Sequence, residues 1–472
     1  MKKQSIEGIV ASIKSSASPT DNVYTIVSGK VAQIRSNMIL NLYDKVSTTE
    51  EEAVDAETCK VEIEGAGTRG EYEKIIDGCM KQLETGENIK AIELKGLPYE
   101  DVVRNAMPRL SEAAKALARG FISGAPVIVR FHNDGDGFSG AVALYRALAK
   151  LQERLFMNER GVLWHINRSI AYTLESAYED MMLFSSYKSA ERPLLLITDF
   201  GTSPESIEAM NQVYGKCELI WLDHHLPYPG FPREKVDYYI NSWDFGGDSS
   251  TTAGLLTCVF SQIISRIDSD LLKQASLVSD YSEYADLGNK EAYKLSLVMD
   301  FLTSGKSRYD SQGATPKQME SIINDRERFE EVFGFATKLL DESLSVGLKN
   351  IRSYRSGKIS IHVLDFGHIA KLGYSYPLPG RYSSKLQEQM EALNNGKTIT
   401  VIHYGSYISI RESRDISEKV KLLEIIEKMK ASGEALSGGG HSEAASIRID
   451  GKNVKEILKS LLSEFGVGQT DG

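Results

Sequence analysis

Residues 127–141 read VIVRFHNDGDGFSGA, an apolar run followed by a polar, glycine-rich stretch. The apolar run predicts a short buried strand, and a helix is expected to begin near Phe138. His132, Asp134 and Asp136 therefore fall in the loop where a strand ends. Open α/β sheets gather their ligand sites at the carboxyl ends of parallel strands. We therefore expect this loop to form one wall of a binding site.

Further acids and imidazoles follow later apolar runs. The run PLLLIT precedes Asp199, and the run CELIWL precedes Asp223, His224 and His225. Asp280 follows a third apolar stretch, LLKQASLVS. Because the carboxyl ends of parallel strands share one sheet edge, we expect all of these residues to meet at strand ends.

This mixture of side chains fits a site for two divalent cations. Such a site needs several carboxylates, one of them bridging, with a few imidazoles and open positions for water and a phosphate oxygen. The expected ligands are His132, Asp134, Asp136, Asp199, His224 and Asp280. Carboxylates with imidazole suit Mn²⁺ best and Mg²⁺ acceptably. Each residue alone has an ordinary explanation as a loop residue, a helix cap or a surface acid, so the hypothesis depends on the ordered set.

Taken in order, these motifs resemble those of the DHH phosphoesterase superfamily, which contains RecJ exonucleases, small-oligonucleotide phosphodiesterases and family II pyrophosphatases. The residues that carry the resemblance are HNDGDG at 132–137, Asp199 in ITDFG, DHH at 223–225 and Asp280 in VSDYSEYAD. The resemblance covers roughly residues 125–449.

The resemblance implies a role for each of these residues. Asp199 would bridge two metal ions, one of which would also be held by His132 and Asp134. The other ion would be held by Asp136, His224 and Asp280. His225 would face the phosphate, and Asp223 would orient the two histidines from outside the metal shell.

A second motif, SGGGHSEAA, lies near the C-terminus and is similar to the GGGH motif of the DHHA1 domain. Its glycines, Gly438, Gly439 and Gly440, are expected to form a loop whose N–H groups hold a terminal phosphate. By this resemblance His441 would stack on a nucleotide or bond to it, and Arg411 in YISIRES would bind phosphate. A flexible glycine linker is the alternative.

The pattern along the chain predicts an α/β protein with a parallel-sheet DHH domain, a smaller α/β DHHA1 domain and an N-terminal small β-domain. The segments are a β-domain at 1–68, a helical connector at 69–120, the DHH domain at 121–290, a helical connector or docking insertion at 291–349 and the DHHA1 domain at 350–472. For the β-domain, an OB-like barrel that could carry nucleic acid and an accessory domain of other use both remain open. An amphipathic helix is expected to follow Pro108.

Composition limits the classes of function. A chain of 472 residues can bury a large core, and its formal charge of -10 argues against a broadly basic, histone-like nucleic-acid binder. Binding made local by metal ions stays compatible with that charge. The four cysteines include no C-x-x-C pair, which argues against a zinc or disulfide framework and fits the cytoplasm. No leader-like or membrane-length apolar run is evident, so secretion and membrane insertion are not expected.

The leading hypothesis is a metal-dependent exonuclease, a phosphodiesterase that degrades single-stranded DNA or RNA from an end to mononucleotides, in DNA replication or repair. The arrangement looks closest to archaeal RecJ-like proteins, some of which associate with the replisome. By that resemblance, GINS-like replication proteins would dock on residues 291–349. Two alternatives remain open: a replisome-associated component whose binding role dominates, and a phosphodiesterase for short oligonucleotides or cyclic dinucleotides.

Overall fold

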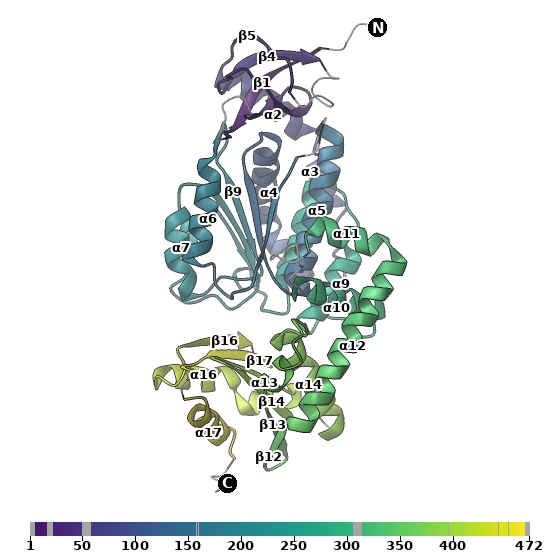
Figure 1. The fold of residues 1–472 in the computed structure, drawn as a ribbon, viewed down its shortest axis with the longest axis vertical. Coiled ribbons are helices and arrows are strands. Elements are labelled where there is room, and N and C mark those ends of the chain that lie inside the picture. The colour runs from purple at the N-terminus through teal and green to yellow at the C-terminus, as the bar shows by residue number, and fades with distance from the viewer. Residues whose placement is uncertain are drawn as a thin grey trace. The chain divides into compact units, whose positions relative to one another are not determined.

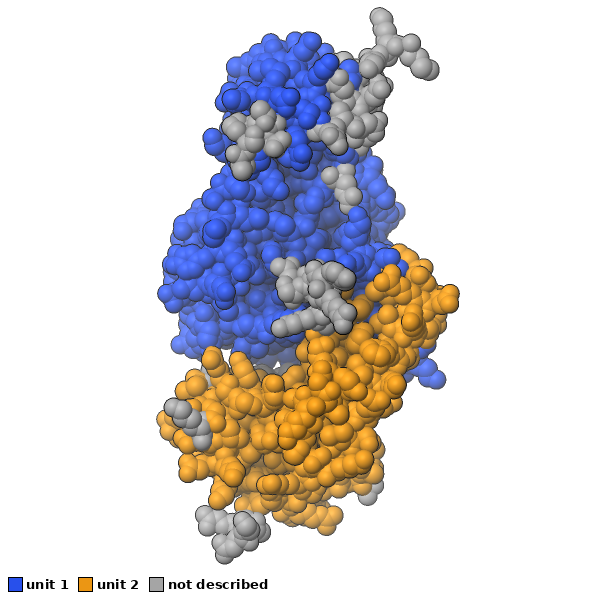
Figure 2. Space-filling view, in the orientation of Figure 1, with its two compact units in different colours: residues 1–299, 315–321 blue, residues 300–314, 322–472 orange. Residues whose placement is uncertain are grey.

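The computed structural model describes residues 5–16, 22–49, 58–156, 158, 160–304, 314–394, 396–441, 443–451 and 453–467. The chain divides into two compact units (Figure 2). Unit 1 comprises Met1–Met299 with Thr315–Ser321, and unit 2 comprises Asp300–Ala314 with Ile322–Gly472. The chain therefore passes between the units inside the predicted connector. The five segment boundaries drawn from the sequence stay predictions.

Unit 1 begins with an antiparallel sheet of short strands (Figure 1). Its strands are β1 (Ser5–Lys14), β2 (Val23–Val27), β3 (Val31–Arg35), β4 (Asp44–Thr49), β5 (Glu62–Ala66) and β8 (Tyr187–Ser189). The order is β3-β2-β1-β4-β5, and β8 also pairs with β1. The predicted N-terminal β-structure is confirmed. Within the described residues β3 and β5 do not pair, so the strand path is open and the OB-like barrel stays a prediction.

Three helices follow this sheet: α2 (Arg69–Lys81), α3 (Thr85–Lys90) and α4 (Glu100–Ile122). The amphipathic helix expected after Pro108 is present, but it is longer than the expectation, because α4 begins at Glu100 and contains the proline. A proline removes one N–H donor from a helix. Burial of an apolar face that runs from Val102 to Ile122 outweighs that loss.

A parallel five-stranded sheet forms the centre of unit 1. Its strands are β6 (Val127–His132), β7 (Leu163–Asn167), β9 (Leu194–Thr198), β10 (Glu218–Asp223) and β11 (Tyr238–Asn241). Their order is β11-β10-β9-β6-β7, and every neighbouring pair is parallel. The predicted parallel α/β sheet is therefore confirmed, and its strands all present their carboxyl ends at one edge.

Helices cover both faces of this sheet (Figure 1). On one face α6 (Leu174–Ser185) and α7 (Ile207–Val213) pack in a core around Trp221, which is fully buried. On the other face α5 (Gly135–Leu155) and α8 (Ala253–Ile264) pack together and against the strands, with α9 (Asp270–Ser279) beside them. This second layer brings three helix ends to the edge where β6, β9 and β10 end.

Three helices lie in the predicted connector: α10 (Lys290–Ser304), α11 (Pro316–Asn324) and α12 (Arg326–Asn350). Residues 305–313 of that segment lie outside the described part of the chain. Helix α12 buries Leu339, Leu340 and Leu344 and contacts β13 (Ile359–Asp365) and α14 (Pro379–Asn394) within unit 2. It is therefore part of the core of unit 2 as well as a connection.

Unit 2 contains a mixed sheet in the order β12-β13-β14-β15-β17-β16, in which only β13 and β14 are parallel. The strands are β12 (Arg352–Ser356), β13 (Ile359–Asp365), β14 (Thr398–Tyr404), β15 (Tyr407–Glu412), β16 (Ser437–His441) and β17 (Ala444–Arg448). The helices are α13 (Gly367–Ala370), α14 (Pro379–Asn394), α15 (Arg414–Val420), α16 (Leu422–Ala431) and α17 (Val454–Glu464). This confirms the second, smaller α/β domain. None of the helices in the described residues has the length and apolar character that a membrane span requires.

Candidate metal centre

The first acidic loop lies between β6 and α5. Strand β6 ends at His132, and Asp134 caps α5, because its Oδ1 accepts a hydrogen bond from the N–H of Gly137 at 3.0 Å. Oδ2 of Asp134 lies 2.6 Å from Nδ1 of His132. The helix begins at Gly135 rather than near Phe138, since Asp134 supplies a cap earlier than the apolar pattern indicates.

Asp136 lies in the first turn of α5, and its side chain is completely buried. Its Oδ1 accepts hydrogen bonds from the N–H of Gly254 at 3.0 Å, at the start of α8, and from the hydroxyl of Ser276 in α9. A Cβ atom at Gly254 would lie 2.3 Å from the backbone oxygen of Asp136, so only glycine allows this approach. The contacts fix one carboxylate oxygen and leave Oδ2 available for another ligand.

Asp199 follows β9 and connects the two sides of the site. Its φ angle of 69° is in the left-handed region, which costs a residue other than glycine about 1 kcal/mol or more. Its Oδ2 lies 3.8 Å from Nδ1 of His132, and its Oδ1 lies 3.3 Å from Nε2 of His224. A strained backbone thus directs one carboxylate toward both imidazoles.

His224 follows β10, and its ring is oriented by the backbone of another loop. Nδ1 lies 2.8 Å from the carbonyl oxygen of Ser249, to which it can only donate, so in the neutral ring Nε2 presents a lone pair. Nε2 lies 3.1 Å from Oδ2 of Asp280 and 3.8 Å from Oδ2 of Asp136. Asp280 caps the C-terminus of α9, so the expectation that it ends a strand is wrong.

Asp223 is fully buried and is surrounded by hydrogen-bond donors. Its Oδ1 accepts from the N–H of His224 at 2.8 Å and lies 2.8 Å from Nδ1 of His225, and its Oδ2 accepts from the hydroxyl of Thr202 at 2.8 Å. Although burial opposes its charge, the two histidines and Thr202 lower the pKa of Asp223 to about 2. The charged carboxylate holds His225, whose side chain is 50% exposed.

These side chains form three overlapping groups of ligand-type atoms, and within each group the atoms lie within 4.8 Å of one another. The groups are His132, Asp134 and Asp199; Asp136, His224 and Asp280; and Asp199, Asp223, His224 and His225. The first two groups contain the two ligand sets expected from the sequence, and Asp199 lies beside both. The structure thus brings all eight predicted residues together, while their roles as ligands stay a prediction.

Three atoms in the site test whether it fits a cation. Oδ2 of Asp136, Oδ2 of Asp199 and Nε2 of His224 are buried and have no hydrogen-bond partner among the described residues. All three are electron-pair donors, and each belongs to a residue in the overlapping groups. Buried polar atoms are rarely left unpaired. A divalent cation would satisfy them, so this donor set fits the metal.

The pKa shifts in the site also fit bound cations, because several buried carboxylates lie close together. Burial, with the neighbouring Asp134 and Asp136, raises the pKa of Asp199 well above its ordinary value. Burial and the charge of Asp280 raise the pKa of Asp136 to about 7. Burial opposes a charged imidazole, yet Asp280 and Asp136 raise the pKa of His224 to about 9. These groups retain protons that divalent cations would displace.

The predicted phosphate-binding residues lie in unit 2. Arg411, in β15, donates from Nε to the hydroxyl of Ser383 at 3.3 Å. The glycine motif is not a loop, because Ser437–His441 forms the edge strand β16 and pairs with β17. Arg411 pairs with Ala444, and Ala444 pairs with His441, so the three residues form one row across the sheet. The side chain of His441 lies outside the described part of the structure.

Several residues that shape the site escaped sequence analysis. The carbonyl of Ser249 orients His224, the N–H of Gly254 and the hydroxyl of Ser276 hold Asp136, and the indole N–H of Trp243 donates to the carbonyl of His224 at 3.0 Å. Most of these contacts use backbone atoms or a hydroxyl, for which sequence carries no distinctive signal. Of these residues, Gly254 is the one that the sequence could have indicated, because it lies at the start of an apolar helix.

Comparison with known proteins supports the α/β architecture described above. No protein-family model matches the sequence. The chain is 24% identical over 444 residues to the uncharacterized protein MJ1198 of Methanocaldococcus jannaschii, which covers 81% of this chain and 58% of that protein. The chain thus spans 58% of the length of this curated relative.

The solved DHH domain of a member of the S1p family of ribosomal proteins has a similar fold, with a TM-score of 0.65 at 21% identity. The match covers 84% of this chain and 99% of that one. The chain has a DHH-domain fold. The fold that the sequence resemblance implied is confirmed. RecJ from Thermus thermophilus, solved with Mn²⁺, is less similar, with a TM-score of 0.49 at 16% identity over 84% of this chain and 59% of that one.

Proposed function

We propose that this DHH-fold protein is a metal-dependent phosphodiesterase that shortens single-stranded DNA or RNA from an end and releases mononucleotides. The observation that carries this proposal is Asp199, a buried carboxylate that lies between two groups of metal-type ligands. A carboxylate shared by two such groups is what hydrolysis with two divalent ions requires.

In this proposal His132 and Asp134 would hold one Mn²⁺ or Mg²⁺ ion, Asp136, His224 and Asp280 would hold the other, and Asp199 would serve both. Ions bound there would make water nucleophilic at neutral pH and would neutralise charge on a phosphodiester. Nδ1 of His225 donates to Asp223, which leaves Nε2 as the ring atom available to the substrate. Asp223 acts through His225 and the backbone and does not touch the phosphate.

We assign the binding of the nucleic-acid end to unit 2. Arg411 offers a planar fork of donors for phosphate oxygens. Strand β16 is an edge strand, so N–H groups of Gly438, Gly439 and Gly440 that point away from β17 can donate to a ligand. Gly438 also has a packing role, since a Cβ there would lie 2.7 Å from Cγ2 of Ile447.

The proposal is tested by incubating the protein with Mn²⁺ and end-labelled strands. The substrates are single-stranded DNA, single-stranded RNA and duplex DNA, each labelled at one end or the other, with a dinucleotide and a cyclic dinucleotide in parallel. We expect mononucleotides from single strands, no cleavage in EDTA, and a loss of at least about a thousandfold in rate for Asp199→Ala. Asp101→Asn, which alters an exposed acid in α4, serves as a control that keeps full activity.

Two results would contradict the proposal. One is that the wild type leaves every strand intact in Mn²⁺, and the other is that Asp199→Ala degrades strands as fast as the wild type. Cleavage of the dinucleotide or the cyclic dinucleotide with intact long strands would replace the exonuclease by the short-substrate phosphodiesterase.

A GINS-like replication partner stays a prediction for the segment containing α10, α11 and α12. Deleting this segment would remove part of the core of unit 2, because α12 buries Leu339, Leu340 and Leu344. The suitable test is therefore a substitution on its exposed surface. Phe335 is 54% exposed, and we expect Phe335→Glu to abolish capture of a replication protein while the nuclease stays active. Capture that survives this substitution would count against docking through that face of α12.

A further inference from the structure

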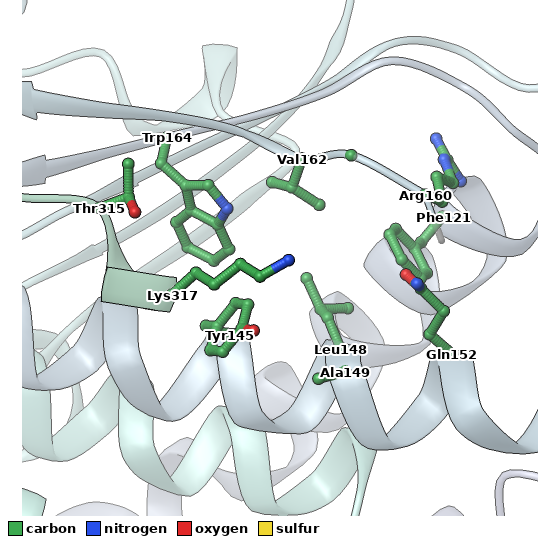
Figure 3. A pocket seen from close by; sticks show the side chains of 11 residues that line it. Phe121, Tyr145, Leu148, Ala149, Gln152, Arg160, Val162, Trp164, Thr315 and Lys317 are labelled. Carbon is green, nitrogen blue, oxygen red and sulfur yellow. The ribbon is translucent and has the colours of Figure 1, made fainter. Parts of the chain in front are cut away.

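A second site in unit 1 lies away from the metal centre. A cavity of about 250 Å³ is lined by the end of α4, the middle of α5, the start of β7 and the first residues of α11 (Figure 3). On α5 its walls include Tyr145 and Gln152, which follow Asp136 by roughly 14 to 24 Å along the helix axis at 1.5 Å per residue. The cavity is thus separate from the residues assigned to phosphodiester cleavage.

Arg160 lines the cavity and is only 6% exposed. Its Nη2 donates to the carbonyl of Ala125, and its guanidinium lies 4.6 Å from the centre of the Phe121 ring. Its Nη1 has no hydrogen-bond partner among the described residues, and no acidic side chain there offsets its charge. Burial lowers the pKa of Arg160 to about 9, which leaves the side chain cationic at neutral pH. A buried cation without an anion is unfavourable, so an anionic ligand would stabilise this arrangement.

The rest of the cavity supplies a second cation and aromatic walls. Lys317 reaches across the cavity, with its ammonium between Trp164 and Phe121 (Figure 3). Trp164 and Tyr145 pack edge to face, with ring centres 6.3 Å apart. One end of the cavity therefore offers aromatic surface for a flat ring, and the other offers Arg160 for an anion.

We propose that this cavity binds a small phosphate monoester that carries a flat ring, of the size of a nucleoside 5′-monophosphate. The phosphate lies between Arg160 and Lys317, where a guanidinium fork suits its oxygens, and the ring lies against Trp164 and Tyr145. The volume is below the usual range for drug-sized ligands, which favours a ligand with one ring system and one phosphate. This proposal does not depend on the nuclease activity.

The test is a titration of the intact protein with 5′-AMP, adenosine and inorganic phosphate in EDTA, which keeps the metal centre empty. Tryptophan fluorescence reports binding. Of the three tryptophans only Trp164 lines the cavity, so the Trp164→Phe variant shows whether the fluorescence change comes from the cavity. We expect 5′-AMP to give a saturable change that Trp164→Phe abolishes. Adenosine and inorganic phosphate are each expected to bind about tenfold more weakly, since each lacks one half of the ligand.

Two variants probe the cations against matched controls. Arg160→Gln should weaken 5′-AMP binding about tenfold, and Lys317→Gln should weaken it severalfold. Arg154→Gln and Lys150→Gln change exposed cations of α5 outside the cavity lining and should bind within twofold of the wild type. If circular dichroism shows that Arg160→Gln does not fold, the Lys317→Gln variant tests the proposal, because Lys317 is exposed.

Several results would overturn the proposal. They are the absence of a saturable change with 5′-AMP, equal affinity for adenosine and 5′-AMP, and wild-type affinity in the folded cation variants. Equal affinity for inorganic phosphate and 5′-AMP would remove the ring from the proposed ligand and so contradict it as well.

Discussion

Asp199 combines two features that are unfavourable for stability. Its backbone is left-handed, and its buried carboxylate lies among other acids, which raise its pKa well above the ordinary value. Neither feature helps a protein to fold without metal. Both are explained if this residue is held in place to share two cations.

The first prediction concerns Asp199→Asn. Asparagine tolerates a left-handed backbone and carries no charge, so in EDTA the variant should be more stable than the wild type. We expect a gain of about 1 kcal/mol, equivalent to about 3 °C in the midpoint of thermal unfolding, together with loss of nuclease activity. Differential scanning fluorimetry in EDTA measures the shift, with Asp101→Asn as the matched control. A variant less stable than the wild type would contradict the account of charge crowding.

The second prediction concerns Glu412 in β15, which is 3% exposed and whose carboxylate oxygens have no hydrogen-bond partner among the described residues. Burial, with the charge of Glu443, raises the pKa of Glu412 to about 8. Between pH 5 and pH 8 the unfolded chain loses this proton before the folded chain does, so stability falls as pH rises. Glu412→Gln should flatten that dependence. Urea unfolding of both proteins in EDTA at pH 5.5 and pH 7.5 measures it, and equal slopes would refute the assignment.

At the scale of elements, the candidate metal ligands meet where β6, β9 and β10 end beside the termini of α5, α8 and α9. The strands were predictable, because each is a short apolar run followed by polar residues. The position of Asp280 was not, since a run such as LLKQASLVS fits a short helix as well as a strand. The strand Ser437–His441 looked like a loop because glycine disfavours strands, and only its pairing with β17 reveals it. Tertiary pairing of this kind leaves no local pattern in the sequence.

The third prediction concerns the start of α8. Gly254→Ala should lower the free energy of unfolding by about 2 kcal/mol or more, because its Cβ would lie 2.3 Å from the backbone oxygen of Asp136 and 2.6 Å from its Oδ1. Displacing Asp136 should also weaken Mn²⁺ binding. Gly334→Ala in α12 is the matched control: nothing lies within 4 Å of its Cβ, so it should stabilise the protein by about 0.5–1 kcal/mol. Equal stability of the two variants in urea would show that the contact at Gly254 is not tight.

At the scale of the whole molecule, the proposed functions are divided between the units. The groups of metal-type ligands found among the described residues belong to unit 1, and Arg411 with the glycine motif belongs to unit 2. Within unit 1, β8 pairs with β1, which ties the N-terminal sheet to the chain segment between α6 and β9. The N-terminal strands are therefore an integral part of unit 1.

This division gives the fourth prediction. Calorimetry should show two unfolding transitions, and Mn²⁺ at about 100 times its dissociation constant should stabilise one of them by about 2.7 kcal/mol for each ion bound while leaving the other unchanged. Arg411→Ala should not alter the shift caused by Mn²⁺. A shift of both transitions, or of neither, would contradict the placement of the ions in unit 1.

The central claim is that one carboxylate, Asp199, joins two metal sites. Isothermal titration of the metal-free protein with Mn²⁺ tests it most directly. We predict two ions per wild-type chain, loss of one in His132→Ala, and loss of both in Asp199→Ala, with Asp101→Asn unchanged. A wild type that binds no Mn²⁺, or an Asp199→Ala variant that still binds two ions with wild-type affinity, would contradict the shared metal centre.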